Sequence, residues 1–424
     1  MCISPGRVSI WQHSPQLDSV KKANSKFGPG ILVAAAFIGP GTVTTASIAG
    51  AQFGFALLWA LVFSVAATIL LQEMAARLAL VTRRGLAETL RASYRDSWLG
   101  AAAVILVVGA VGVGNAAYQT GNITGAALGL ASITGIGLNW WALLVGLLAG
   151  GLLASGTYRL IEKLLIGLVL LMSVVFLLTL AMVRPSFSAM LEGLLVPSLP
   201  AGSLLTVMAL IGTTVVPYNL FLHASAVQEK WSADVDVKTA LHQSRVDTSL
   251  SIGLGGIITL AVLGTSAAAF FGSGIEFSAV NMSRQLEPLL GKSAGYFFAA
   301  GLFAAGLSSA VTAPLAAAYA VCGVMGWPRD LRGKRFRQVW FAVLLTGTLF
   351  ATAGIKPLAA ILFAQAANGF LLPFCAVFLL LVMNRKDVLG AYVNKRWVNG
   401  LGGIVVLVTF ALGLLKILQV AGVF

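Results

Sequence analysis

Two apolar stretches each contain a proline and several hydroxyl side chains where an uninterrupted helix would be expected. One reads "AAAFIGPGTVTTASIAG" (34–50) and the other "VMALIGTTVVPYNLFLHAS" (207–225). Proline removes a backbone donor and clashes with the preceding turn, so each helix should break there. In lipid, the freed backbone groups must find partners or line a cavity. Helix C-terminal carbonyls attract cations and helix N-termini attract anions, so the two stretches predict a ligand site between broken helices.

The composition is that of a membrane protein. The 424 residues are 58% hydrophobic and 10% charged, with a mean hydropathy of +0.92, whereas soluble proteins are about 25% charged. Since a membrane helix needs roughly 20 apolar residues, we expect an all-α fold with about eleven transmembrane helices. The predicted helices cover 28–53, 55–80, 101–131, 139–157, 160–183, 202–228, 246–271, 294–325, 337–353, 357–384 and 397–421.

The basic residues indicate the orientation of the chain. With the N-terminus in the cytoplasm, all but five of the 28 Lys and Arg fall in cytoplasmic segments; the exceptions are Arg184, Arg284, Lys292, Lys356 and Lys416. This is the positive-inside bias. The net charge of +14 therefore reflects topology and anionic lipid neighbours rather than a nucleic-acid partner. We expect a multi-pass protein of the cell inner membrane with a cytoplasmic N-terminus and no cleavable signal peptide.

The two interruptions fall in the first and sixth predicted helices. Five helices per half is an odd number, so the second half must enter the membrane from the opposite side, which gives an inverted five-plus-five repeat. Interrupted helices at matching positions of two repeats indicate a transporter's central site and alternating access. The predicted parts are a cytoplasmic tail (1–27) and one integral domain (28–424), which holds the first repeat (28–183), the second repeat (202–384) and an extra helix (397–421).

Several motifs in order carry a family resemblance: "FGPGILVAAAFIGPGTVTT", "GLAETLR", "LIEKLLIGLVLL", "TTVVPYNLFLHAS", "AAGLSSAVTAPLA" and "LFAQAANGFLLP". Over nearly its whole length the chain resembles the Nramp (natural resistance-associated macrophage protein) family of divalent-metal transporters. The resemblance implies the fold of the leucine-type amino-acid transporters, with first and sixth helices that are discontinuous. It also implies secondary active transport of divalent metal cations.

The chain departs from the family pattern at the metal ligands. The family's aspartate, asparagine and methionine ligands fall at Gly39, Thr42 and Val216, and its first histidine after the sixth-helix proline falls at Tyr218. The resemblance leaves four candidate metal-contacting positions, which are Ala36, Thr42, Thr213 and Gln365. The wider predicted substrate site comprises Ala36, Gly39, Gly41, Thr42, Thr213, Val216, Tyr218, Asn219 and Gln365.

A second set of residues is predicted to form the pathway or to couple transport. The family's acidic residues on the third helix match Gln119 and Asn122, beside Tyr118, and a later family histidine matches His223. His223 lies within a predicted span, and an imidazole can titrate near neutral pH. Asp247 opens the seventh helix at the cytoplasmic edge, where a gate is expected. The predicted pathway or coupling residues are Tyr118, Gln119, Asn122, His223 and Asp247.

The residue types leave several functions open. Carbonyls, hydroxyls and amides without a thioether or carboxylate suit magnesium better than manganese or iron, so a divalent cation of the Mn²⁺ or Mg²⁺ class is one substrate. Glycines on both sides of Pro40 let backbone amides approach a ligand closely, so an amino acid or organic anion is another, and other ions remain open. A sensor that keeps the fold without transport is the further alternative.

An enzyme is not expected. The sequence has no nucleophile–base pair, no zinc-type cluster and no phosphate-binding loop with its lysine. We expect no cofactor, a small ion or small molecule as substrate, and the lipid bilayer as the main partner. The oligomeric state stays open, and a monomer is compatible with the sequence.

Overall fold

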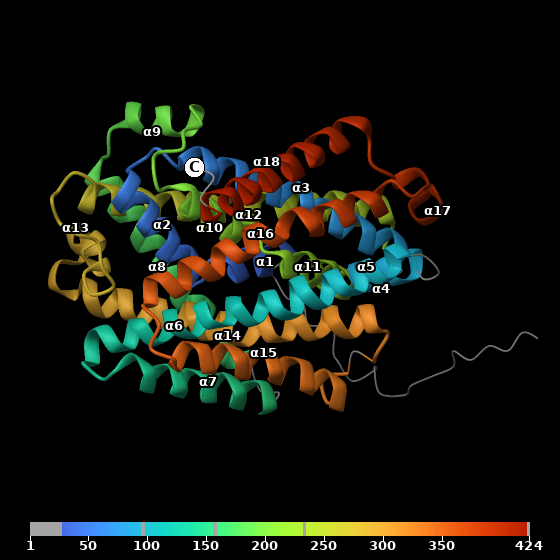
Figure 1. The fold of residues 1–424 in the computed structure, drawn as a ribbon, viewed down its shortest axis with the longest axis horizontal. Helices are drawn as coiled ribbons and strands as arrows, with labels where there is room; N and C mark the ends of the chain where they lie inside the picture. Colours follow the sequence, from blue (N-terminus) through green and yellow to red (C-terminus); the bar gives the residue numbers. More distant parts are fainter. Residues whose placement is uncertain (1–27, 95–97, 156–158, 232–234, 329, 422–424) are drawn as a thin grey trace, which may run out of the picture.

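The computed structural model describes residues 28–94, 98–155, 159–231, 235–328 and 330–421. Over these residues all regular secondary structure is helical, with no strand. The long helices form a bundle, with α7 and α15 along one side and α18 along the opposite side (Figure 1). The all-α fold expected from composition is confirmed. The predicted tail lies outside the described residues.

Each of the eleven predicted ranges holds a helix or a broken helix in the described part of the chain. By length and apolar composition, eight helices can cross a membrane, or nine if the bent pair of α8 and α9 counts as one span. The helices in the eleven ranges are α1 (Pro29–Phe37) with α2 (Pro40–Phe53), α3 (Leu58–Thr82), α5 (Trp98–Leu106) with the π-helix η1 (Val107–Val113) and α6 (Gly114–Thr134), α7 (Leu138–Ser155), α8 (Arg159–Val183), α10 (Leu204–Thr214) with α11 (Pro217–Lys230), α12 (Val237–Phe270), α14 (Ala294–Met325), α15 (Lys334–Thr352), α16 (Pro357–Met383) and α18 (Arg396–Val420).

Both predicted breaks are present. α1 ends at Phe37 and α2 begins at Pro40, while α10 ends at Thr214 and α11 begins at Pro217. In both cases proline occupies the first helical position, where its missing N–H costs nothing because that group has no intrahelical partner. Proline therefore ends one half-helix and starts the next.

Small residues bring the helices close around these breaks. A Cβ added to Gly50 of α2 would lie 2.1 Å from the Leu263 carbonyl of α12. A Cβ added to Gly212 of α10 would lie 2.0 Å from the Gln365 carbonyl of α16. Such close backbone approach through glycine is typical of membrane helix packing. It holds α2 against α12 and α10 against α16.

The largest departure from the predicted boundaries is at the start of one long helix, while other helix ends differ by a few residues. α12 begins at Val237 rather than 246, since Asp236 caps it by accepting a hydrogen bond from the Thr239 amide. Its first turns are polar, so hydropathy alone excluded them from the predicted span. The remaining helical pieces were not predicted; they are α4 (Leu86–Ser93), α9 (Phe187–Leu195), η2 (Met282–Leu286), α13 (Glu287–Leu290), η3 (Gly291–Ser293), α17 (Lys386–Leu389) and η4 (Gly390–Tyr392).

Candidate functional site

The two broken helices meet through a pair of threonines. The hydroxyl oxygens of Thr42, on α2, and Thr213, on α10, lie 2.8 Å apart. Thr42 also donates to the carbonyl of Phe37, the last residue of α1. Both threonine side chains are fully buried. The hydroxyls therefore join the C-terminal end of each first half-helix to the N-terminal end of α2.

Gln365 lies beside the N-terminus of α2. A Cβ added to Gly41 would lie 2.1 Å from the Gln365 Nε2 atom, so only glycine leaves room for that amide. Gln365 is fully buried, and neither its Oε1 nor its Nε2 has a hydrogen-bond partner among the described residues. Buried amides are nearly always paired. An unpaired one at a helix N-terminus indicates a place where a ligand supplies the partner.

The second break carries a similar group. Asn219 is in the first turn of α11, is fully buried, and has neither amide atom paired within the described chain. The Val216 carbonyl accepts from the backbone amide of Asn219 at 3.0 Å. Val216 itself contributes a buried apolar side chain. Tyr218 packs edge-on against Tyr118 of α6, with ring centroids 5.5 Å apart.

Gly39 lies in the first break, and Ala36 lies just before it. A Cβ on Gly39 would lie 2.9 Å from the Ser309 hydroxyl of α14 and 4.0 Å from the Tyr118 hydroxyl, so this position faces α14 and α6. Ala36 lies in the last turn of α1, where carbonyls have no intrahelical partner. The first-break positions predicted from the sequence thus surround one junction.

The polar residues of the third span divide into two groups. The amides of Asn115 and Gln119 donate to the carbonyls of Ala313 and Ala310 on α14, at 3.1 and 2.8 Å. Asn122 donates to the Gln119 side chain at 3.3 Å, and its own Oδ1 has no partner in the described residues. Asn115 and Gln119 therefore attach α6 to α14, while Asn122 keeps a free acceptor.

His223 is remote from water. It is fully buried, and its Nε2 atom lies 3.4 Å from the Thr248 hydroxyl of α12. This contact links α11 to α12, because Thr248 directly follows Asp247 on α12. The role of His223 in coupling stays a prediction.

Charged and polar contacts close the side of the bundle predicted to be cytoplasmic. Asp247 accepts a hydrogen bond from the Gly30 amide at 2.7 Å, which fastens the start of α1 to α12. Nearby, Glu73 of α3 pairs with Arg77 at 3.0 Å and with Arg245 of α12 at 2.8 Å. Glu73 and Arg77 are four residues apart on α3, a spacing that places two side chains next to each other on a helix. Arg245 pairs with Glu73, a contact that local spacing could not indicate.

The opposite end is closed by Gln285, which sequence reasoning missed. This residue of η2 is fully buried and donates to the Ser47 hydroxyl of α2 at 3.0 Å and to the Met282 carbonyl at 2.8 Å. Ser266 of α12 donates to the Ser47 carbonyl at 2.7 Å. Thr42, Thr213, Asn219 and Gln365 are all buried in this structure.

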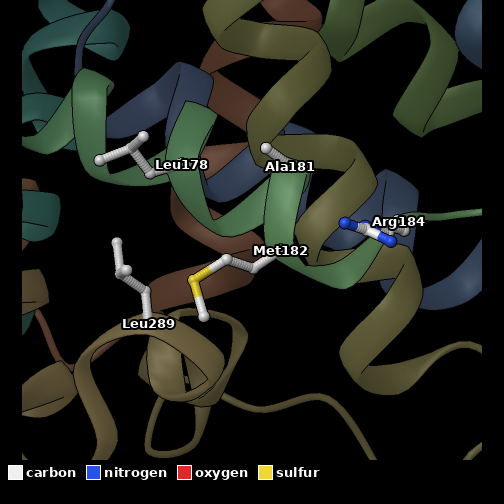
Figure 2. A pocket seen from close by; sticks show the side chains of 5 residues that line it. All are labelled: Leu178, Ala181, Met182, Arg184 and Leu289. Atoms are coloured by element: carbon white, nitrogen blue, oxygen red, sulfur yellow. The ribbon is translucent and has the colours of Figure 1, made fainter.

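A surface hollow lies away from this centre. Figure 2 shows that its lining comes from the end of α8 and from α13, and the labelled side chains are Leu178, Ala181, Met182, Arg184 and Leu289. Leu178 and Met182 are about half exposed, so the hollow is a groove on an apolar outer surface. It contains none of the predicted site residues.

The central site is electrically neutral in its side chains. It offers hydroxyls, amides and helix-end carbonyls, and no group of three or more His, Cys, Asp or Glu residues gathers anywhere in the described residues. The structure brings Gly39, Gly41, Thr42, Thr213 and Gln365 to one junction.

Comparison with known proteins decides the family. The model of the family described as "Natural resistance-associated macrophage protein-like" matches residues 30–419. This chain belongs to the Nramp family. The resemblance read from the broken helices and the motifs is confirmed, and the chain is a multi-pass integral membrane protein.

Curated relatives match almost end to end. The divalent metal cation transporter MntH of Deinococcus radiodurans is 29% identical over 91% of this chain and 87% of its own. The MntH of Chromohalobacter salexigens is 30% identical over 91% of this chain and 89% of its own.

Solved structures confirm the fold. A mutant of the Eremococcus coleocola manganese transporter aligns with a TM-score of 0.74 at 24% identity, over 92% of this chain and 86% of that one. MhsT in complex with L-phenylalanine aligns with a TM-score of 0.60 at 17% identity, over 91% of this chain and 98% of that one. The expected discontinuous-helix transporter fold is therefore correct.

Proposed function

We propose that this Nramp protein is a secondary active transporter that moves divalent metal cations of the Mn²⁺ or Mg²⁺ class by alternating access. The curated relatives are divalent metal cation transporters, and the chain matches them over nearly its full length. The observation that carries the proposal is the junction of two broken helices, where Thr42 and Thr213 meet beside the unpaired amide of Gln365.

The donor set favours a hard cation. Carbonyl, hydroxyl and amide oxygens suit Mg²⁺ and tolerate Mn²⁺, while a thioether would favour softer transition metals. Val216 occupies the position where the family pattern has its methionine, so no sulfur enters the site there. Mg²⁺ gives up its water reluctantly, and a site of neutral oxygens can bind it without removing the whole hydration shell.

Alternating access follows from the two closures. Opening toward the predicted cytoplasmic side requires breaking the Asp247–Gly30 hydrogen bond and separating Arg245 from Glu73. Opening toward the other side requires moving Gln285 off Ser47. Because both closures join half-helices of the central site to α12 or η2, motion of these half-helices would expose the substrate to one side at a time.

The same proposal includes an inner-membrane location with the N-terminus in the cytoplasm, supported by the asymmetric distribution of Lys and Arg. It includes a role as a transporter rather than an enzyme, which the names of the relatives support. A membrane-impermeant amine reagent tests this orientation. We expect it to label the N-terminus in broken vesicles and not in sealed right-side-out vesicles.

Uptake into proteoliposomes tests the function. Mn²⁺, Mg²⁺ and amino acids are each offered with and without a pH gradient, and we expect uptake of at least one of the two cations above that of empty liposomes. Thr213→Val removes the hydroxyl that meets Thr42 and should reduce uptake. Thr214→Val is the matched control, since Thr214 bonds only to the Leu210 carbonyl of its own helix.

Three results would contradict the proposal. Uptake of amino acids without either cation would favour the organic-solute alternative. Binding without uptake of any substrate would favour a sensor. Equal losses in the Thr213 and Thr214 variants would mean that the junction does not contact the cation.

A further inference from the structure

We propose that the divalent cation enters the site together with a small carboxylate anion, which neutralises part of its charge. The inference rests on the proposed function, and it concerns the chemical form of the substrate. It follows from two observations at the same junction: the described side chains at the breaks carry no charge, and side-chain amides beside them are unpaired.

The charge problem comes first. Moving a divalent cation into a low-dielectric interior is very costly unless an opposite charge compensates it. In the described residues, the side chains at the breaks are Thr42, Thr213, Tyr218, Asn219 and Gln365, and all are neutral. Carbonyl dipoles alone can hold a cation but leave its full net charge in place. A compensating anion that travels with the cation reduces this cost.

The site also has a place for an anion. The helix α2 has 14 residues and begins at Pro40, and its first intrahelical hydrogen bond runs from the Val43 amide to the Gly39 carbonyl. The amides of Gly41 and Thr42 therefore precede the helical bonding pattern and are available, at the positive end of the helix dipole. A helix N-terminus of this kind binds carboxylates readily.

Independent evidence comes from the buried side-chain amides. Gln365 Nε2 points at the N-terminus of α2, close enough that a Cβ on Gly41 would collide with it. Both Nε2 and Oε1 of Gln365 are buried and unpaired in the described structure, as are Nδ2 and Oδ1 of Asn219 in the first turn of α11, so each amide has a donor as well as an acceptor to offer. An N–H donor finds no acceptor on a bare cation, and metal-bound water accepts poorly because its lone pair faces the metal. Both donors fit an anion.

The cation has its own half of the junction. The first half-helices, α1 and α10, present their C-terminal carbonyls there, at the negative end of the dipole. The hydroxyls of Thr42 and Thr213, which lie 2.8 Å apart, add oxygen ligands. Each break thus offers a cation-attracting end and an anion-attracting end next to one another.

A carboxylate fits this arrangement better than a halide. Its two oxygens can serve two partners, one oxygen for the cation and the other for the N–H donors. A halide offers a single atom to both. The substrate class is therefore a divalent cation paired with a small carboxylate.

Flux measurements on the full-length protein in proteoliposomes test the inference. Mn²⁺ uptake is measured at a fixed free Mn²⁺ concentration, in chloride, in acetate and in malonate, with ¹⁴C-malonate as a second label. We expect carboxylate to raise Mn²⁺ uptake about tenfold, which equals about 1.4 kcal/mol of stabilisation. Labelled malonate should enter only when Mn²⁺ is present.

Gln365→Glu provides the sharpest variant, since it places a carboxylate within the protein at the proposed anion position. Mn²⁺ uptake by this variant should become independent of added carboxylate. Gln285→Glu is the matched control: Gln285 is equally buried, but its amide is bonded to Ser47 and Met282. Whatever its absolute rate, this control should keep the wild-type ratio of carboxylate to chloride uptake.

The possible outcomes separate this inference from the proposed function. Equal Mn²⁺ uptake in chloride and carboxylate, with no entry of ¹⁴C-malonate, overturns the paired substrate and leaves cation transport intact. Absence of Mn²⁺ and Mg²⁺ uptake in every anion overturns the proposed function itself. Entry of malonate without a cation overturns both. The wild-type measurements decide among these outcomes even if Gln365→Glu fails to fold.

Discussion

The ion cluster at the predicted cytoplasmic side and the central junction differ in whether their polar side chains have partners in the protein. In the cluster, Glu73 pairs with Arg77 and Arg245, and Arg77 also donates to the Tyr392 carbonyl and the Asn394 side chain. At the junction, the side chains are neutral and the amide of Gln365 is unpaired in the described structure.

This difference assigns different roles to the two regions. A partly buried charge whose partners are all in the protein stabilises one conformation, because losing a partner is costly. A buried amide without a partner destabilises that conformation, and a ligand that supplies the partner removes this penalty. We therefore assign the cluster to a structural closure, and we propose that the junction is the ligand site.

The largest expected effect is on stability, from Arg77→Ala. The substitution leaves Glu73 with one partner and removes two bonds to the segment before α18, so it should cost about 3 kcal/mol of folding free energy. Arg245→Ala is the control: its side chain is 54% exposed, so its loss should cost less than about 1 kcal/mol. Thermal unfolding in detergent measures both, and equal shifts in melting temperature would contradict the structural role given to Arg77.

Gly41→Ala should abolish most transport without a similar loss of stability. Its Cβ would lie 2.1 Å from Gln365 Nε2, so the amide must move away from the N-terminus of α2. Misplacing a binding group by about 1 Å can cost a factor of about a hundred. Cation uptake in proteoliposomes measures the loss. The control is Gly253→Ala on α12, where a Cβ meets nothing within 4 Å; wild-type uptake in Gly41→Ala would refute the assigned position of Gln365.

Gly39→Asp should strengthen Mn²⁺ binding about tenfold, because a carboxylate adds a charged ligand and compensates part of the cation's charge. The added Cβ lies 2.9 Å from the Ser309 hydroxyl, which can rotate away. Calorimetry of the purified variant measures the affinity, with Gly39→Asn as the neutral control of similar size. An affinity no higher than that of Gly39→Asn, in a folded protein, would place the cation elsewhere.

The smallest expected effect is on the opening of the Asp247–Gly30 closure at the predicted cytoplasmic side. Asp247→Asn replaces a charged acceptor of the Gly30 amide by a neutral one, and should weaken that hydrogen bond by about 1 kcal/mol. Hydrogen exchange of the α1 amides should become about fivefold faster. Asp236→Asn is the control, since Asp236 is the N-cap of α12, the helix that carries Asp247, and asparagine caps a helix as well as aspartate does. Unchanged exchange in Asp247→Asn would show that this bond does not hold α1 in place.

The breaks were predictable because their cause is local. Pro40 and Pro217 interrupt helices whatever surrounds them, and hydropathy marks the spans around them. The start of α12 was missed because its first turns are polar, and hydropathy reports contact with lipid rather than helix formation. Short helices such as α4 and α9 lack the length from which a span is recognised.

The pairing of side chains could not be predicted, since it depends on contacts between distant segments. Gln285 and Ser47 are 238 residues apart, and nothing in the sequence around either indicates the other. The direction of Gln119 toward α14 likewise depends on how α6 packs, because helical periodicity fixes which residues share a face but not what that face meets.

Anomalous diffraction from crystals grown with Mn²⁺ tests the central claim most directly, because it locates the cation without reference to function. The account predicts a peak at the junction of the broken helices, within about 5 Å of the hydroxyls of Thr42 and Thr213. A peak at the cluster of Glu73 and Asp247 instead, with none at the junction, would contradict it.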